Sequence, residues 1–175
     1  MPRRLLALVL LSACSMDEYV IEEGDHSSTS RVSIITGSSM VFEAIFDGSA
    51  VYETVDPSNQ ADINKLMGFS DCSSHHHSNS ARFGWRWYDD ELQIHAYTYA
   101  DGDRSNQLLG TAEVDMVDTY RIEVDADRYL FTFDGSTTEM DRGCSGSSIS
   151  GYQLYPYFGG DETAPHDITI RVNEL

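Results

Sequence analysis

Short segments in which apolar and polar side chains alternate recur along most of the chain. They span residues 39–46, 50–55, 81–88, 92–99, 120–124, 129–133, 152–158 and 168–172. Aspartate, often followed by glycine, comes after several of these segments, as in Asp47-Gly48 and Asp134-Gly135. Alternation with a period of two predicts β-strands that bury one face. Many short strands separated by such turns favour an all-β fold, an antiparallel β-sandwich or jelly roll.

The stretch from 81 to 99 contains the clearest hairpin. If Asp89-Asp90 forms a two-residue turn, each residue of the first strand faces a defined residue of the second. The apolar residues then pair as Phe83 with Ala96, Trp85 with Ile94, and Trp87 with Leu92. Because all three pairs are apolar, we expect this face of the hairpin to lie in the core.

The opposite face of the same hairpin carries the candidate ligand-binding residues. They are Arg82, Arg86, Gln93, His95, Tyr97 and Tyr99. Gly84 lies opposite His95 in this register, and we expect open space there. Tyrosine rings pack on sugars, glutamine and histidine bind hydroxyl groups, and arginine binds carboxylates with two hydrogen bonds. We therefore expect a carbohydrate partner, in particular a uronate-containing polysaccharide; a solvated outer face is the alternative.

The length of 175 residues suits one domain, and a hydrophobic content of 41% is enough for one core. Such a content is too high for a disordered chain. We expect residues 31–175 to form a single β-sandwich domain. The polar and charged residues 14–30 are expected to be a tether in front of it, in which Val20-Ile21 is a weak candidate for a first strand.

The first residues have the order of a secretory signal peptide. Arg3 and Arg4 precede an apolar run that is too short to span a bilayer. The residues Leu11-Ser12-Ala13-Cys14 resemble the lipobox of bacterial lipoproteins. This resemblance implies that residues 1–13 are removed and that Cys14 carries fatty acyl chains such as palmitate. It also implies export and anchoring to the outer membrane, on its periplasmic or cell-surface side; a plain secretory signal is the alternative.

The charge of the chain is strongly unbalanced. Asp and Glu number 29 against 11 Lys and Arg, which gives a net charge of −18. This balance argues against nucleic acid as a partner, and we expect membrane contact only through the lipid anchor. We expect no required cofactor. Calcium is an expectation for the Asp-rich turns, with Asp101 and Asp103 as candidate ligands; ordinary turns are the alternative.

Two cysteines remain besides Cys14. An even pair in an oxidising compartment predicts a disulfide between Cys72 and Cys144, and a Cys/His metal site is the alternative. His75 and His77 follow Cys72 closely. They are candidate ligands for a transition metal if the segment is extended, because residues two apart then share a face. An exposed polar loop is the alternative for these histidines.

Two longer segments resemble concanavalin-like and laminin-G-like domains. Residues 120–135, YRIEVDADRYLFTFDG, are similar to the paired strands of those domains, which end in an Asp-Gly turn. Residues 157–172, YFGGDETAPHDITIRV, look like their closing segment. The resemblance implies a concanavalin-like jelly roll, whose concave face often binds carbohydrate.

The hairpin also resembles alginate-lyase-type polysaccharide lyases in a short motif. Gln93-Ile94-His95 matches their Gln-Ile-His motif, and Arg82 and Arg86 are similar to their paired arginines. The resemblance implies that Gln93 and Arg82 neutralise a uronate carboxylate and that His95 acts as the base. It implies that Tyr157 or Tyr155 supplies the acid. Neutralising the carboxylate and positioning a base are what proton removal next to it needs.

The sequence departs from that lyase pattern between the two arginines. Phe83-Gly84-Trp85 stands there in place of the family's acidic residue. We therefore expect a carbohydrate-binding lipoprotein rather than an enzyme. A polysaccharide lyase acting on a uronate-containing polymer is one alternative, and a structural or protein-interaction lipoprotein is the other.

Overall fold

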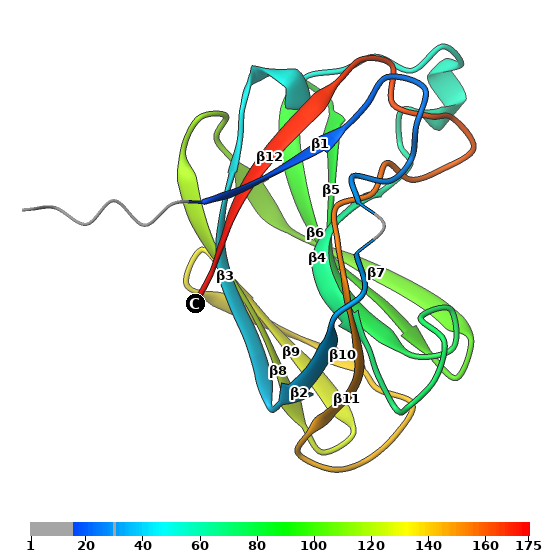
Figure 1. Cartoon of the computed structure of the whole chain (residues 1–175), viewed down its shortest axis with the longest axis vertical. Coiled ribbons are helices and arrows are strands. Elements are labelled where there is room, and N and C mark those ends of the chain that lie inside the picture. The colour runs from blue at the N-terminus through cyan, green and yellow to red at the C-terminus, as the bar shows by residue number, and fades with distance from the viewer. Residues whose placement is uncertain (1–15, 30) are drawn as a thin grey trace, which may run out of the picture.

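The computed structural model describes residues 16–29 and 31–175 of the chain. Within them, two six-stranded antiparallel sheets pack face to face (Figure 1). The predicted all-β fold, an antiparallel β-sandwich of the jelly-roll type, is confirmed.

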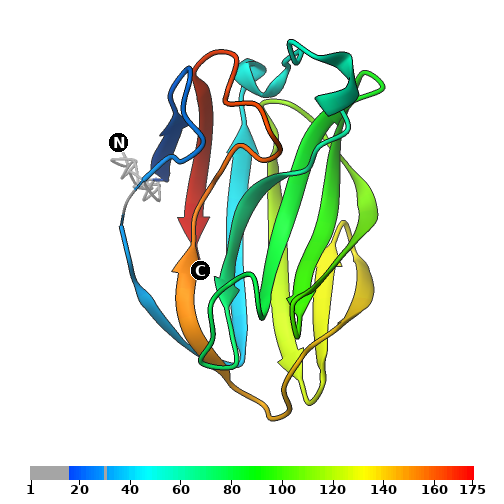
Figure 2. The ribbon, with the colours of Figure 1, turned by 90° about the vertical axis from the view of Figure 1, so that its right-hand side faces the viewer.

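Both sheets combine strands from distant parts of the sequence. In spatial order, the first sheet consists of β1 (Asp17–Ile21), β12 (Ile168–Glu174), β3 (Ser39–Phe46), β8 (Val117–Asp125), β9 (Arg128–Phe133) and β10 (Ser136–Asp141). The second sheet consists of β2 (Ile34–Gly37), β11 (Ile149–Leu154), β4 (Asn64–Ser70), β5 (Ser80–Tyr88), β6 (Glu91–Ala100) and β7 (Asp103–Ala112). Figure 2 shows β4, β5 and β6, coloured teal to green, running side by side. Two short 3-10 helices, η1 (Gly48–Ala50) and η2 (Pro57–Asn59), lie between β3 and β4 in the sequence.

The core lies between the two sheets and is rich in aromatic rings. Trp85 on β5 is fully buried and packs against Phe46 on β3, with ring centroids 5.1 Å apart. Phe42 on β3 stacks on Tyr120 on β8 at 5.2 Å. The apolar faces predicted from alternation therefore meet in one core, whose burial is the main driving force for folding.

The β5–β6 hairpin has the predicted register. Trp85 lies opposite Ile94, and the same register continues along the whole of β5. Asp89 and Asp90 form the turn with φ values of 54° and 58°, which is the backbone conformation that a two-residue hairpin turn requires. The candidate binding residues therefore face away from the core, as the pairing predicted.

Two of the predicted strands differ from the structure. Residues 50–55 are not a strand, because the preceding residues turn into η1, where Asp47 Oδ1 accepts a hydrogen bond from the Ser49 N–H at 2.9 Å. The predicted strand over 152–158 ends at Leu154. Pro156 follows, and proline has no N–H with which to continue a ladder.

The predicted tether over residues 14–30 is wrong for residues 17–21. They form β1, which pairs with β12 along its full length. Tyr19 and Ile21 are buried, so the folded domain begins well before residue 31. The predicted signal peptide over 1–13 and the lipobox cysteine Cys14 lie outside the described residues. None of the helices in the described part of the chain has the length and apolar character needed to cross a membrane.

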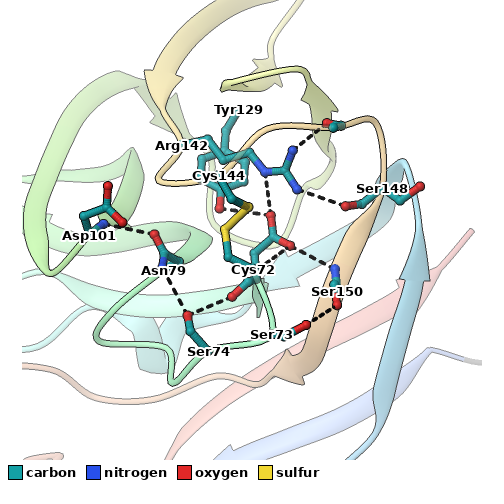
Figure 3. The surroundings of a disulfide bond; sticks show 12 residues. Cys72, Ser73, Ser74, Asn79, Asp101, Tyr129, Arg142, Cys144, Ser148 and Ser150 are labelled. Atoms are coloured by element: carbon teal, nitrogen blue, oxygen red, sulfur yellow. Dashed lines mark hydrogen bonds and ion pairs between the residues drawn. A yellow bond between two sulfur atoms is a disulfide. The ribbon is translucent and has the colours of Figure 1, made fainter.

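A disulfide joins Cys72 to Cys144, as predicted (Figure 3). Next to it, a buried ion pair connects Arg142 Nε to Asp71 Oδ2 at 2.7 Å. The Tyr129 hydroxyl donates a hydrogen bond to the same carboxylate oxygen at 3.1 Å. These contacts fasten the loop after β4 to the loop after β10. The loop after β4 carries the three consecutive histidines of the chain.

Candidate functional site

The outer face of the β5–β6 hairpin is more buried than the sequence suggests. Four of the six candidate binding residues are only 3% to 8% exposed: Arg82, Gln93, His95 and Tyr97. Arg86 and Tyr99 are half-buried. Other parts of the chain therefore cover most of this face, and ligand binding by all six residues stays a prediction.

Ile63, immediately before β4, is part of this cover. A Cβ atom built on Gly84 would lie 2.5 Å from Ile63 Cγ2 and 3.5 Å from His95 Cβ. The open space predicted opposite His95 is thus filled by the Ile63 side chain. Arg86 Nη1 donates a hydrogen bond to the carbonyl oxygen of Ala61 at 2.6 Å, which holds this segment against the sheet.

His95 is sealed from solvent. Neither of its ring nitrogens has a hydrogen-bond partner among the described residues. Burial, followed by the charge of Arg86, lowers the pKa of His95 to about 4, so the ring is neutral at neutral pH. The residue predicted as a catalytic base therefore lies beneath the surface in this conformation.

The two arginines of the hairpin are engaged by neighbouring groups. Arg82 Nη2 donates a hydrogen bond to the carbonyl oxygen of Tyr155 at 2.5 Å, and burial lowers the pKa of Arg82 to about 10. Arg82 Nε is buried without a partner in the described part of the chain. Arg86 Nε donates a hydrogen bond to Gln93 Oε1 at 2.8 Å, so these two cross-strand neighbours bind each other.

Three adjoining cavities form a groove on this outer face. Their volumes are about 310, 190 and 230 Å³. The first two share Lys65 and Tyr97, and the first and third share Arg82 and Tyr157. We call these three joined cavities the groove.

Cationic side chains are concentrated around the groove, although the protein as a whole is acidic. Five cationic side chains line it: Arg31, Lys65, Arg82, Arg86 and Arg104. Asp62 is the one carboxylate among the described residues that line it. Nearly half of the 11 Lys and Arg residues of the chain therefore face one hollow. A positive groove on a protein with a net charge of −18 favours an anionic ligand.

Lys65 lies at the junction of two of the cavities. Its Nζ lies 4.8 Å from the ring centroid of Tyr97 and donates a hydrogen bond to the carbonyl oxygen of Ile63 at 2.6 Å. Burial, with the charges of Arg82 and Arg104, lowers the pKa of Lys65 to about 8. Burial, reinforced by Tyr99, raises the pKa of Tyr97 to about 12.

Aromatic rings line the same groove. Tyr157 is 37% exposed and stacks on His26, with centroids 5.3 Å apart and planes inclined by 8°. The backbone of Tyr157 is bonded to that of Lys65 in both directions, at 2.8 and 3.0 Å, which brings the segment after β11 onto β4. Tyr97 and Tyr99 meet edge to face at 6.0 Å. Of the predicted ligand-binding and catalytic residues, Arg82, Arg86, Tyr97, Tyr99, Tyr155 and Tyr157 line the groove, and Gln93 and His95 do not.

Sequence reasoning missed Lys65, Arg104 and Arg31. A signal for Arg104 was present, because the Asp101-Gly102 turn places it opposite Tyr99 in the next hairpin. Lys65 is the only lysine of the chain. Arg31 lines the groove because the segment before β2 packs beside the segment after β11, and no local sequence pattern predicts this contact. Its guanidinium donates hydrogen bonds to the hydroxyl groups of Tyr155 and Tyr19.

The predicted metal ligands have different environments. His75 and His77 lie in a turn rather than an extended segment, and His76 joins them so that one ligand atom of each lies within 4.8 Å of the others. Asp101 and Asp103 flank the exposed turn between β6 and β7. They belong to no group of three or more metal-ligating side chains among the described residues, so calcium there stays a prediction.

Another hollow, of about 320 Å³, lies at the tip of the β5–β6 hairpin. Tyr52 and Trp87 line it together with Glu53, Asp89 and Asp90. Its lining, as far as the described residues form it, holds three carboxylates and no cationic side chain. It therefore does not suit the anionic ligand that the groove favours.

No protein-family model matches this sequence, and a search of curated proteins found no similar sequence. Solved structures with the same fold do exist. The alginate lyase AlyC3 has a TM-score of 0.64 at 12% identity, and the match covers 91% of this chain and 73% of the lyase. The family 18 polysaccharide lyase aly-SJ02 has a TM-score of 0.56 at 9% identity, covering 94% of this chain and 88% of that one.

A third structure with this fold is a glucanase. The laminarinase catalytic domain from Thermotoga maritima has a TM-score of 0.55 at 11% identity, covering 90% of this chain and 74% of the laminarinase. At these identities the likeness establishes the fold, a concanavalin-like jelly roll. The names of these three proteins describe enzymes. They therefore do not support the expectation, drawn from the sequence, that this protein is not an enzyme.

Proposed function

We propose that the groove binds an acidic polysaccharide whose sugar units carry carboxylates, that is, a uronate polymer. The observation that carries this proposal is the concentration of five cations around one hollow of a strongly acidic protein. Elsewhere the excess of Asp and Glu repels a polyanion, so the groove is the favoured place for it to bind.

The aromatic residues support a sugar rather than a small inorganic anion. Tyr99 and Tyr157 present rings on the walls of the groove, and rings of this kind pack against the C–H faces of sugars. Arg104 and Lys65 line the groove, and their cationic groups can bind carboxylates along the chain of sugars. Because three cavities join, the groove offers room for more than one sugar unit.

A polysaccharide lyase is the second candidate function. The β5–β6 register places Arg82 and Arg86 beside His95 and Gln93, and solved lyases share the fold. In such an elimination a base removes the proton next to the carboxylate, the C–O bond of the glycosidic link breaks, and an acid protonates the leaving oxygen. His95 is buried beneath Ile63 in this conformation. It can therefore act as that base only if the segment that contains Ile63 moves.

A panel of polymers distinguishes the candidates. Binding is measured by affinity electrophoresis with alginate, polygalacturonate and neutral laminarin, and elimination is followed by the ultraviolet absorbance of the new unsaturated uronate. Retention by the acidic polymers without absorbance supports a binding module, and rising absorbance supports a lyase. If none of the three polymers slows the protein in the gel and the ultraviolet absorbance does not rise, both candidates are contradicted and a protein-interaction role is favoured.

We also propose that this binding takes place at a bacterial membrane surface. The order of Arg3, Arg4, an apolar run and Leu11-Ser12-Ala13-Cys14 supports export and lipidation at Cys14. Several acyl chains on one cysteine hold a protein firmly to a bilayer, since each buried methylene contributes about 0.8 kcal/mol. The domain would then hold a polysaccharide close to the outer membrane.

A further inference from the structure

Three consecutive histidines form a compact cluster beside the groove, where His76 lines two of its cavities. The ring centroids of His75 and His76 lie 4.1 Å apart, those of His76 and His77 4.3 Å, and those of His75 and His77 5.1 Å. A tight turn produces this arrangement, because the carbonyl oxygen of His75 accepts hydrogen bonds from the N–H groups of Ser78 and Asn79 at 2.8 and 3.1 Å. In an extended strand the middle ring would point the opposite way.

The base of the loop is fixed by several contacts. Asp71 N–H donates to the Asn79 carbonyl at 2.9 Å, and the Asn79 side chain donates to Ser74 Oγ at 3.2 Å. The disulfide of Cys72 ties the same loop to the neighbouring one (Figure 3). The three imidazoles are therefore carried on a short, closed loop rather than on a free tail, which lowers the entropy cost of gathering them around a ligand.

Tyr152 orients the middle imidazole. The Tyr152 hydroxyl lies 2.8 Å from His76 Nδ1 and also accepts a hydrogen bond from the His76 backbone N–H at 3.2 Å. With Nδ1 engaged, Nε2 of His76 is left for another partner. A hydrogen bond to the second ring nitrogen is the usual support of a metal-bound histidine, because it fixes the ring and its tautomer.

We propose that His75, His76 and His77 bind a divalent late transition metal of the zinc class. One ligand atom from each residue lies within 4.8 Å of the others. Zinc–nitrogen bonds of about 2.0–2.1 Å place two nitrogens on a tetrahedral ion about 3.4 Å apart, so small side-chain rotations close the site. Imidazole ligands favour zinc, copper and nickel over calcium or magnesium.

Three protein ligands leave one coordination position open. His76 and His77 line the same cavity as Tyr99 and Arg82, so this position is beside the groove. The cations of the groove repel a metal ion, and an anionic fourth ligand such as hydroxide or a carboxylate offsets that repulsion. Metal binding needs no polysaccharide. The metal-site proposal can therefore be tested independently of the proposed polysaccharide binding.

The test is a zinc titration of the full chain without an affinity tag. All samples carry Cys14→Ser so that no free thiol binds metal, and are first dialysed against a chelator. Zn²⁺ is added against a chromophoric competitor, and Co²⁺ is added separately to record its visible absorption bands. The expected result is one Zn²⁺ per chain with a micromolar or tighter Kd, and Co²⁺ bands of the intensity typical of four-coordinate sites.

Variants locate the site. Tyr152→Phe is expected to weaken Zn²⁺ binding about tenfold, and His77→Ala and His76→Ala by more, since each loses a ligand. His166→Ala is the matched control, because His166 bonds to the Ser49 carbonyl outside the cluster. His77 is exposed, so its removal leaves the fold intact, as circular dichroism will verify. Absence of Zn²⁺ binding by the parent chain, or equal Kd values for His77→Ala and His166→Ala, would overturn the proposal.

Discussion

Ile63 occupies the space that Gly84 leaves above the sheet. A Cβ on Gly84 would approach Ile63 Cγ2 to 2.5 Å and the Asn64 carbonyl oxygen to 3.2 Å. This contact explains why His95, next to Gly84 across the hairpin, is sealed although it faces away from the core. Because a larger side chain at position 84 would clash with Ile63, this position requires glycine.

Gly84→Ala is expected to destabilise the protein by about 1–3 kcal/mol, as overpacking does. The cost should be smaller in an Ile63→Ala background, where the clashing methyl group is absent. Urea unfolding of the two single variants and the double variant measures this coupling. Strictly additive losses would show that Ile63 does not fill the space above Gly84.

The pH dependence of stability provides a test of the buried His95. Its pKa of about 4 in the folded protein is below the ordinary value of 6.5, so the unfolded chain binds the extra proton first as pH falls. The contribution of His95 to stability is therefore present above pH 6.5 and is lost as pH falls toward 4, by as much as about 3 kcal/mol.

The measurement compares urea unfolding of the wild type and His95→Leu at pH 7 and pH 5. The wild type should lose more stability than the variant over this interval, because the variant lacks the titrating ring. NMR titration should also show the pKa of His95 rising in Ile63→Ala, where solvent reaches the ring. An unshifted pKa near 6.5 in the wild type would refute the burial of His95.

The disulfide should contribute substantially to stability. Cys72 and Cys144 are 72 residues apart, and closing a loop of this length contributes about 4 kcal/mol in the chain-entropy model. The double variant Cys72→Ser/Cys144→Ser should lose stability of this order in urea unfolding. Two reactive thiols in the unfolded, unreduced Cys14→Ser protein would show instead that the bond does not form.

Lipidation is tested at Cys14. A bacterial host grown with labelled palmitate should incorporate the label into the wild type and not into Cys14→Ser, because the acyl chains need the cysteine. Both forms should be exported if the segment before Cys14 acts as a signal. Equal labelling of the two forms would contradict the anchor.

Local patterns predicted the local parts of the fold. The alternation in 81–99 and the turn at Asp89-Asp90 were sufficient for the β5–β6 register, because both strands lie next to each other in the sequence. They indicated β1 only at Val20-Ile21, because its partner β12 lies at the other end of the chain. A five-residue strand among charged residues carries too weak a pattern to be told from a polar tether.

The site was predicted in part for the same reason. Register alone brought Arg82, Tyr97 and Tyr99 to one face, and all three line the groove. It could not show that the loop containing Ile63 folds back over His95, nor that Tyr157 and Lys65 meet from distant segments. Contacts made by loops depend on the whole fold, and alternation along a strand does not encode them.

The central claim is that the cationic groove holds a polyuronate, and a charge reversal at Arg104 tests it most directly. Arg104 is exposed on the groove, whereas Arg121 is paired with Glu123 on the other sheet. Arg104→Glu and Arg121→Glu change the net charge equally, so the second variant controls for it. We predict that calorimetric titration with oligomannuronate gives at least about tenfold weaker binding for Arg104→Glu, or about 1.4 kcal/mol, and wild-type binding for Arg121→Glu. Equal affinities of the two variants would contradict the claim.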